Sequence, residues 1–112
     1  MGNYENMGMT ILKSFFDYYC EQKLDDAEYV RVVKVIINGI QESMLSSDIA
    51  EKEVVSLKNR LIGFNRKLYK DLWIKNAKEH EDPERIDLDL DSESESAIYY
   101  FDYIYEHGEH PR

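Results

Sequence analysis

Residues 47–80 read SDIAEKEVVSLKNRLIGFNRKLYKDLWIKNAKEH, and this stretch decides the fold of the chain. Asp48 followed three residues later by Glu51 is a capping-box pattern, which predicts the start of a helix. No proline interrupts the pattern that follows until Pro83, which ends it. We therefore expect a single long helix over residues 48–80.

The apolar residues of this helix fall on two neighbouring arcs when the sequence is projected at about 100° per residue. The first arc contains Val54, Leu57, Leu61, Phe64, Leu68 and Leu72, and the second contains Val55, Ile62, Tyr69 and Trp73. Together the arcs cover about half of the helix surface, which is too wide for one partner helix. The helix is thus predicted to pack against at least two others.

A helix over residues 9–23 is expected on the N-terminal side. Its aromatic residues Phe15, Phe16 and Tyr19 have helical spacing and are predicted to anchor the core. The only cysteine, Cys20, lies within this helix, and we interpret it as a buried thiol. A chain with one cysteine has no internal disulfide and no cysteine-based zinc site.

A second helix is expected over residues 26–45, because Asp25 and Glu28 form another capping box. Gly39 lies inside this pattern and suggests a close helix approach or a bend. The short link to the long helix predicts that the two are antiparallel neighbours. The core stripe of this second helix contains Tyr29, Val33, Ile36, Ile37, Ile40 and Met44.

A fourth helix over residues 93–107 is predicted by the capping box of Ser92 and Glu95 and by the C-terminal pair His107-Gly108. The apolar residues Ala97, Ile98, Phe101, Ile104 and Tyr105 form its buried stripe.

The fold class is therefore all-α, a single domain over residues 1–112. We expect an irregular four-helix bundle built on one long central helix, with an acidic extended connector at 81–92 before the last helix. The two ends, 1–8 and 108–112, are expected to be frayed.

Charge is unevenly distributed along the 112 residues, whose net charge is −9. The segment from Lys58 to Lys78 is basic, with Asp71 as its one acid, whereas the segment from Glu79 to Arg112 is strongly acidic. A net negative charge opposes unassisted binding to nucleic acid or to an anionic membrane and suits a basic protein partner. We therefore expect neither nucleic acid nor membrane as a direct partner.

Motifs for catalysis or cofactor binding are not found. The sequence contains no phosphate-binding loop, no dinucleotide fingerprint and no H-E-x-x-H zinc motif. Asp87, Asp89 and Asp91 have the spacing of the first calcium ligands of an EF-hand loop, but Ser92 and Ile98 replace the required glycine and glutamate. We predict no catalytic residue, no metal site and no cofactor, and the chain is not expected to be an enzyme. Since neither a signal-peptide pattern nor a long apolar run is found, a cytoplasmic location is expected.

The predicted binding surface combines carboxylates, which steer a basic partner, with tyrosines, which anchor it. It contains Asp87, Asp89, Asp91, Glu93, Glu95, Tyr99, Tyr100 and Tyr103. Our first hypothesis is a stoichiometric inhibitor that blocks a basic nucleic-acid-handling protein such as a nuclease, as a toxin-immunity or phage anti-defence protein does. Alternatively, Tyr99, Tyr100 and Tyr103 cover the edge of the core and do not bind a partner.

Two other functions fit the same sequence. The acidic segment could fold back on the basic face of the long helix, giving a structural or regulatory homo-oligomeric subunit, for example a homodimer. The chain could instead be an RNA-binding module that uses residues 58–78. The dependence of stability on salt distinguishes the two arrangements of the acidic segment. If the segment pairs with the basic face, stability should fall as ionic strength rises; if the acidic surface is free, stability should rise because its self-repulsion is screened.

Overall fold

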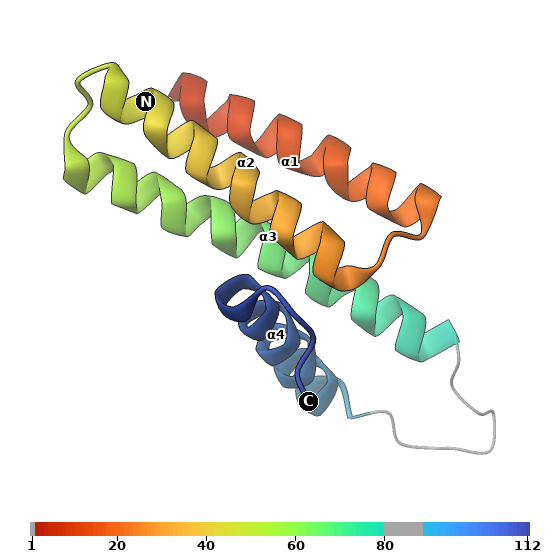
Figure 1. Ribbon diagram of the computed structural model, residues 1–112. Coiled ribbons are helices and arrows are strands. Elements are labelled where there is room, and N and C mark those ends of the chain that lie inside the picture. The colour runs from red at the N-terminus through yellow and green to blue at the C-terminus, as the bar shows by residue number, and fades with distance from the viewer. Residues whose placement is uncertain (1, 80–88) are drawn as a thin grey trace.

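The computed structural model describes residues 2–79 and 89–112, which form four helices connected by short loops and by the segment 80–88 (Figure 1). The helices are α1 (Gly2–Gln22), α2 (Asp26–Ser46), α3 (Glu51–Glu79) and α4 (Leu90–His107). No strand occurs within the described residues. The predicted all-α bundle with one long helix is confirmed.

The α3 helix contacts all three of the others, as the width of its apolar surface predicts. α1 and α4 each pack against both α2 and α3 but do not contact each other. Figure 1 shows α1, α2 and α3 running side by side, while α4 crosses this group obliquely near the C-terminal half of α3. The α2–α3 pair is therefore the shared support of the two outer helices.

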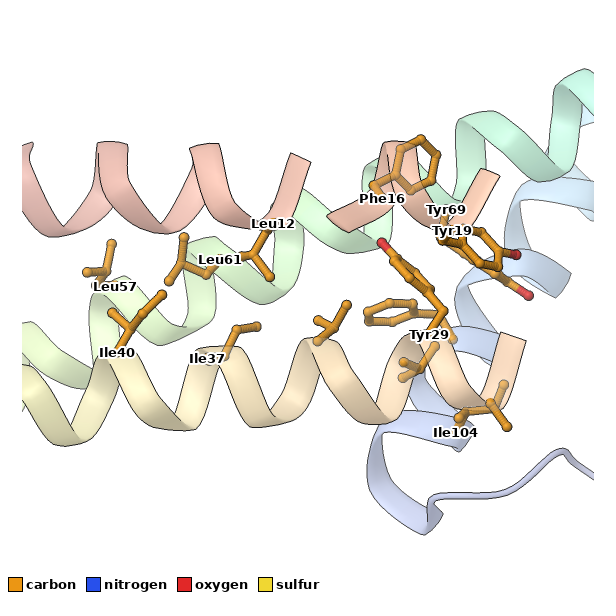
Figure 2. Close-up of a cluster of buried hydrophobic side chains, with 14 of the residues drawn as sticks. Leu12, Phe16, Tyr19, Tyr29, Ile37, Ile40, Leu57, Leu61, Tyr69 and Ile104 are labelled. Carbon is orange, nitrogen blue, oxygen red and sulfur yellow. The ribbon is translucent and has the colours of Figure 1, made fainter. Parts of the chain in front are cut away.

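Side chains from all four helices form one core (Figure 2). Leu12 of α1, Ile37 of α2 and Leu61 of α3 are buried in its middle, and Ile104 of α4 is buried at one end. The second predicted arc of α3 is shorter than expected, because its first residue, Val55, is 45% exposed. One polar residue, Asn65, is completely buried among these apolar side chains.

The N-terminal segment is helical rather than frayed, since α1 begins at Gly2 and not near residue 9. Gly8 is buried where α1 meets α3, and a Cβ atom on it would lie 3.0 Å from the methyl groups of Leu61. The close helix approach that we expected at Gly39 occurs here instead, because nothing lies within 4 Å of a Cβ placed on Gly39.

Asp48 belongs to the turn that closes the C-terminus of α2 and does not start α3. The first predicted capping box is therefore wrong. Its φ of 58° lies in the left-handed region, and the amide of Ile49 donates to the carbonyl of Met44. This bond across five residues is the Schellman pattern that closes a helix C-terminus. α3 then begins at Glu51.

The start of α4 also differs from the prediction. The helix begins at Leu90, because the carboxylate of Asp89 caps it by accepting a hydrogen bond of 3.1 Å from the amide of Ser92. Ser92 therefore lies inside the helix, and residues 90–92 are not extended. The rest of the expected connector lies outside the described residues, apart from Asp89. The N-cap at Asp25 and the left-handed C-terminal residue Gly108 are confirmed.

Two further expectations are corrected. Cys20 is exposed, because it lies on the solvent side of α1 beside the buried Tyr19. The C-terminal residues 108–112 are not simply frayed, because two of them are bonded to the rest of the protein. Arg31 of α2 donates a hydrogen bond of 2.7 Å to the carbonyl of Gly108, and His110 lies 2.9 Å from the carboxylate of Asp25.

Candidate functional site

Four of the predicted binding residues form one stripe on the outside of α4. Asp91, Glu95, Tyr99 and Tyr103 follow each other at four-residue spacing, which places them along one slanted line of helix surface. We name this set the α4 ridge. Tyr99 is 62% exposed, both carboxylates are exposed, and Tyr103 is half-buried. Asp87 lies outside the described residues.

The rings of the ridge support one another. The ring centroids of Tyr99 and Tyr103 are 6.1 Å apart, and those of Tyr103 and His107 are 4.3 Å apart. Contacts between tilted rings of this kind reduce the rotamer freedom that a tyrosine loses when it is covered by a partner.

The other three predicted residues do not belong to this stripe: Asp89 is exposed, and Glu93 and Tyr100 are partly buried. Asp89 caps the helix, Glu93 accepts a hydrogen bond of 2.6 Å from the indole nitrogen of Trp73, and Tyr100 packs on Trp73 with ring centroids 5.6 Å apart. The helical period in the sequence could have shown that Glu93 is not on the outer stripe, because Glu93 lies four residues before the buried Ala97 and therefore on the same side of α4.

Few ion pairs join the acidic and basic parts of the chain. Arg66 of α3 binds Asp102 of α4 with an N–O distance of 3.0 Å, and Arg60 binds Glu5 of α1 at 3.6 Å. Within residues 2–79 and 89–112, these are the ion pairs made by the cations of α3. The carboxylates of the α4 ridge therefore face solvent and not the basic side of α3.

A second group of polar side chains lies where α1, α2 and α3 meet, and sequence analysis did not identify it. The carboxylate of Asp26 accepts hydrogen bonds from the hydroxyl groups of Tyr19 and Tyr69, the second with a length of 2.9 Å. Burial, with the neighbouring charge of Asp26, raises the pKa of both tyrosines well above the ordinary value of 10. Both phenols are therefore protonated donors at neutral pH.

The C-terminal segment is attached beside this group. One ring nitrogen of His110 hydrogen-bonds to the hydroxyl group of Tyr100, and the other lies 2.9 Å from the carboxylate of Asp25. Desolvation raises the pKa of Asp25, but the hydrogen bond and charge of His110 and the amides of Ala27 and Glu28 outweigh it. The pKa of Asp25 is therefore below its ordinary value.

A cavity of about 260 Å³ is lined by Tyr19, Asp26, Tyr69 and Trp73, together with Leu72, Asn76 and Ala77. It adjoins a second cavity of about 300 Å³, because Tyr19, Leu72 and Asn76 belong to the lining of both. Both cavities are partly open to solvent at the end of α1.

Among the described residues, no three histidine, cysteine or acidic side chains are grouped in a way that could hold a metal ion. None of the helices has an apolar stretch sufficient to cross a membrane, as far as the described residues extend. Comparison of the chain with protein-family models, curated proteins and solved structures finds no match.

Proposed function

We propose that this protein is a small acidic interaction module that binds a basic, nucleic-acid-handling protein through the α4 ridge and acts as its stoichiometric inhibitor. The observation that supports the proposal is one surface stripe in which two exposed carboxylates, Asp91 and Glu95, precede the exposed Tyr99 and the half-buried Tyr103. A nuclease or another protein with a cationic groove is the class of partner with complementary charge.

The two residue types have different tasks in such an interface. Carboxylates at the edge accelerate encounter with a cationic surface, and their effect decreases as salt screens the charges. Tyrosine supplies contact area at low entropic cost, so Tyr99 is the expected anchor. The net charge of −9 adds a long-range attraction to the same partner.

One observation favours a second candidate, the homo-oligomeric subunit. Apolar side chains are exposed on α1 and α2: Met7, Ile11, Tyr18, Val32 and Val35, of which Val35 is 69% exposed. Tyr18, Val32 and Val35 line one surface groove between the two helices. An apolar face of this kind is a common feature of interfaces between identical chains.

A matched pair of variants tests the proposal. The ridge variant carries Asp91→Asn, Glu95→Gln and Tyr99→Ala, and it leaves Asp89, Glu93 and Tyr100 unchanged. The control variant carries Glu21→Gln, Glu42→Gln and Tyr18→Ala, all at exposed positions of α1 and α2. Both variants lose two negative charges and one exposed tyrosine, so a difference between them reports the ridge itself.

The native chain and both variants are used as bait in nuclease-treated lysate of the source cells, and the association rate is then measured with the purified partner. We expect the native chain and the control to bind one basic protein, at a rate that falls as salt rises, and the ridge variant to lose it. If both variants recover the same proteins, the ridge is not the interface. If only the control changes, through loss of self-association, the homo-oligomer is the better interpretation.

A further inference from the structure

The cavity between α1, α2 and α3 has the walls of a cation-binding site. Three of its lining residues are aromatic, namely Tyr19, Tyr69 and Trp73, and Asp26 is the one charged residue among those that line it in the described part of the chain. Aromatic ring faces attract organic cations through their quadrupole, and a nearby carboxylate adds a full opposite charge.

Asp26 is held in a fixed position and retains capacity for a further bond. Tyr19 donates to one carboxylate oxygen and Tyr69 donates to the other. Each carboxylate oxygen has a second lone pair, so a ligand N–H group can still be accepted. Within residues 2–79 and 89–112, no lysine, arginine or histidine forms an ion pair with Asp26.

The aromatic walls are also fixed. Trp73 is oriented by the hydrogen bond from its indole nitrogen to Glu93, and its ring centroid lies 6.0 Å from that of Tyr69, with 58° between the ring planes. These two tilted rings line the cavity together with the carboxylate of Asp26. Because ring orientation is set before a ligand arrives, little entropy is lost on binding.

Size and charge restrict the class of ligand. A cavity of about 260 Å³ is smaller than the pockets that hold drug-sized molecules, and it suits a single head group. An anion would be repelled by Asp26, and an uncharged apolar ligand would cover this carboxylate without compensating its charge. An alkylammonium or guanidinium group can make cation–π contacts with the aromatic rings and can also pair with the negative charge of Asp26.

We infer that this cavity binds an organic cation, an alkylammonium or guanidinium group, between Trp73 and the carboxylate of Asp26. The group can belong to a free molecule or to a lysine or arginine side chain of a protein. The site shares no residue with the α4 ridge, so the inference is independent of the proposed function.

Trp73 is the only tryptophan in the chain, so its fluorescence reports this cavity directly. The native protein is titrated at constant ionic strength with tetramethylammonium and with N-acetyl-arginine methyl ester. Uncharged molecules of matched shape, tert-butanol and the corresponding citrulline derivative, serve as controls. We expect saturable changes with the cations and binding at least about tenfold weaker with the uncharged molecules. Equal binding of charged and uncharged members would overturn the inference.

The source of the cation is distinguished by an arginine pentapeptide flanked by glycines, titrated in the same way. Binding tighter than that of the free arginine derivative assigns the site to a protein segment, and weaker binding assigns it to a small molecule.

Variants test the two proposed walls. Asp26→Asn keeps the shape and removes the charge, and it should weaken cation binding about tenfold or more. Trp73→Leu should abolish binding and Trp73→Phe should restore part of it, as followed by NMR shifts of the Tyr69 ring and of backbone amides. Lys23→Ala, which changes only the adjoining cavity, and the ridge variant should bind as the native chain does.

Circular dichroism shows whether each variant is folded. If a folded Asp26→Asn variant or a folded Trp73→Leu variant binds the cations as tightly as the native protein, the inference is wrong. If Asp26→Asn does not fold, the inference is tested by the two variants at position 73. It is supported if Trp73→Phe binds the cations and Trp73→Leu does not, and it is wrong if the two bind equally.

Discussion

The hydroxyl group of Tyr29 in α2 donates a hydrogen bond of 3.1 Å to the side-chain oxygen of Asn65 in α3, and both side chains are completely buried. The amide group of Asn65 donates in turn to the carbonyl of Leu61, at 2.9 Å. Asn65 is the one polar residue in the buried stripe of α3, so its bonds satisfy a group that would otherwise be costly to bury.

This pair should behave as a coupled unit. Tyr29→Phe leaves the oxygen of Asn65 without its donor and should lower the free energy of unfolding by about 1–3 kcal/mol. Asn65→Leu leaves the tyrosine hydroxyl unpaired and should cost a similar amount. The double variant should lose less than the sum of the two, because no buried polar group is then left unpaired. Urea unfolding followed by circular dichroism measures all three, and additive losses would show that the two side chains are not coupled.

Two helical glycines should respond in opposite ways to the same change. Gly39→Ala should raise the free energy of unfolding by about 0.5–1 kcal/mol, because alanine is the better helix former and a Cβ there meets no atom within 4 Å. Gly8→Ala should lower stability, since its Cβ would lie 3.0 Å from Leu61 and 3.2 Å from Ile40. Thermal unfolding of both variants measures the difference, and stabilisation by Gly8→Ala would contradict the close packing of α1 on α3.

The C-terminal segment should contribute to stability through His110 and Asp25. The pKa of Asp25 is lowered in the folded protein, so its contribution is present above the ordinary value of 3.8 and is lost as the pH falls through the folded-state value. His110→Ala should raise the pKa of Asp25 and reduce this loss in acid. A carboxyl-carbon NMR titration of both proteins measures the shift. An unchanged pKa would mean that the backbone amides alone hold the carboxylate ionised.

Alkaline pH should unfold the protein through its buried tyrosines. Burial raises the pKa of Tyr19, Tyr29 and Tyr69 above 10 in the folded state. Their contribution to stability is complete below the unfolded-state value near 10 and is lost above it, because the unfolded chain then releases protons that the folded chain retains. Ultraviolet absorbance of tyrosinate and circular dichroism should therefore change together for these residues. Ionisation without loss of helix would contradict their burial.

Sequence periodicity predicted the four helices and most of the core, because burial of an apolar stripe dominates helix packing. It did not identify the role of Asn65, a polar residue inside the buried stripe of α3, because its partner Tyr29 lies on another helix. The spacing of Glu93 from Ala97 indicates that Glu93 lies toward the inner side of α4, but its partner Trp73 lies on α3 and could not be identified from the period. Capping patterns were right at Asp25 and wrong at Asp48, where the same residue type ends a helix in a left-handed conformation. Asp26 and its two tyrosines could not be grouped from sequence, because 43 residues separate Asp26 from Tyr69.

The exposure of Cys20 gives the chain a single attachment point for a spectroscopic label. The thiol lies on α1 and borders the second cavity, while the single indole, that of Trp73, lies on α3 and borders the first. A dye on this thiol that accepts energy from tryptophan would therefore report the separation of α1 from α3 without any change to the sequence. Desolvation raises the pKa of the thiol, so the labelling reaction should be slow at neutral pH and faster in mildly alkaline buffer.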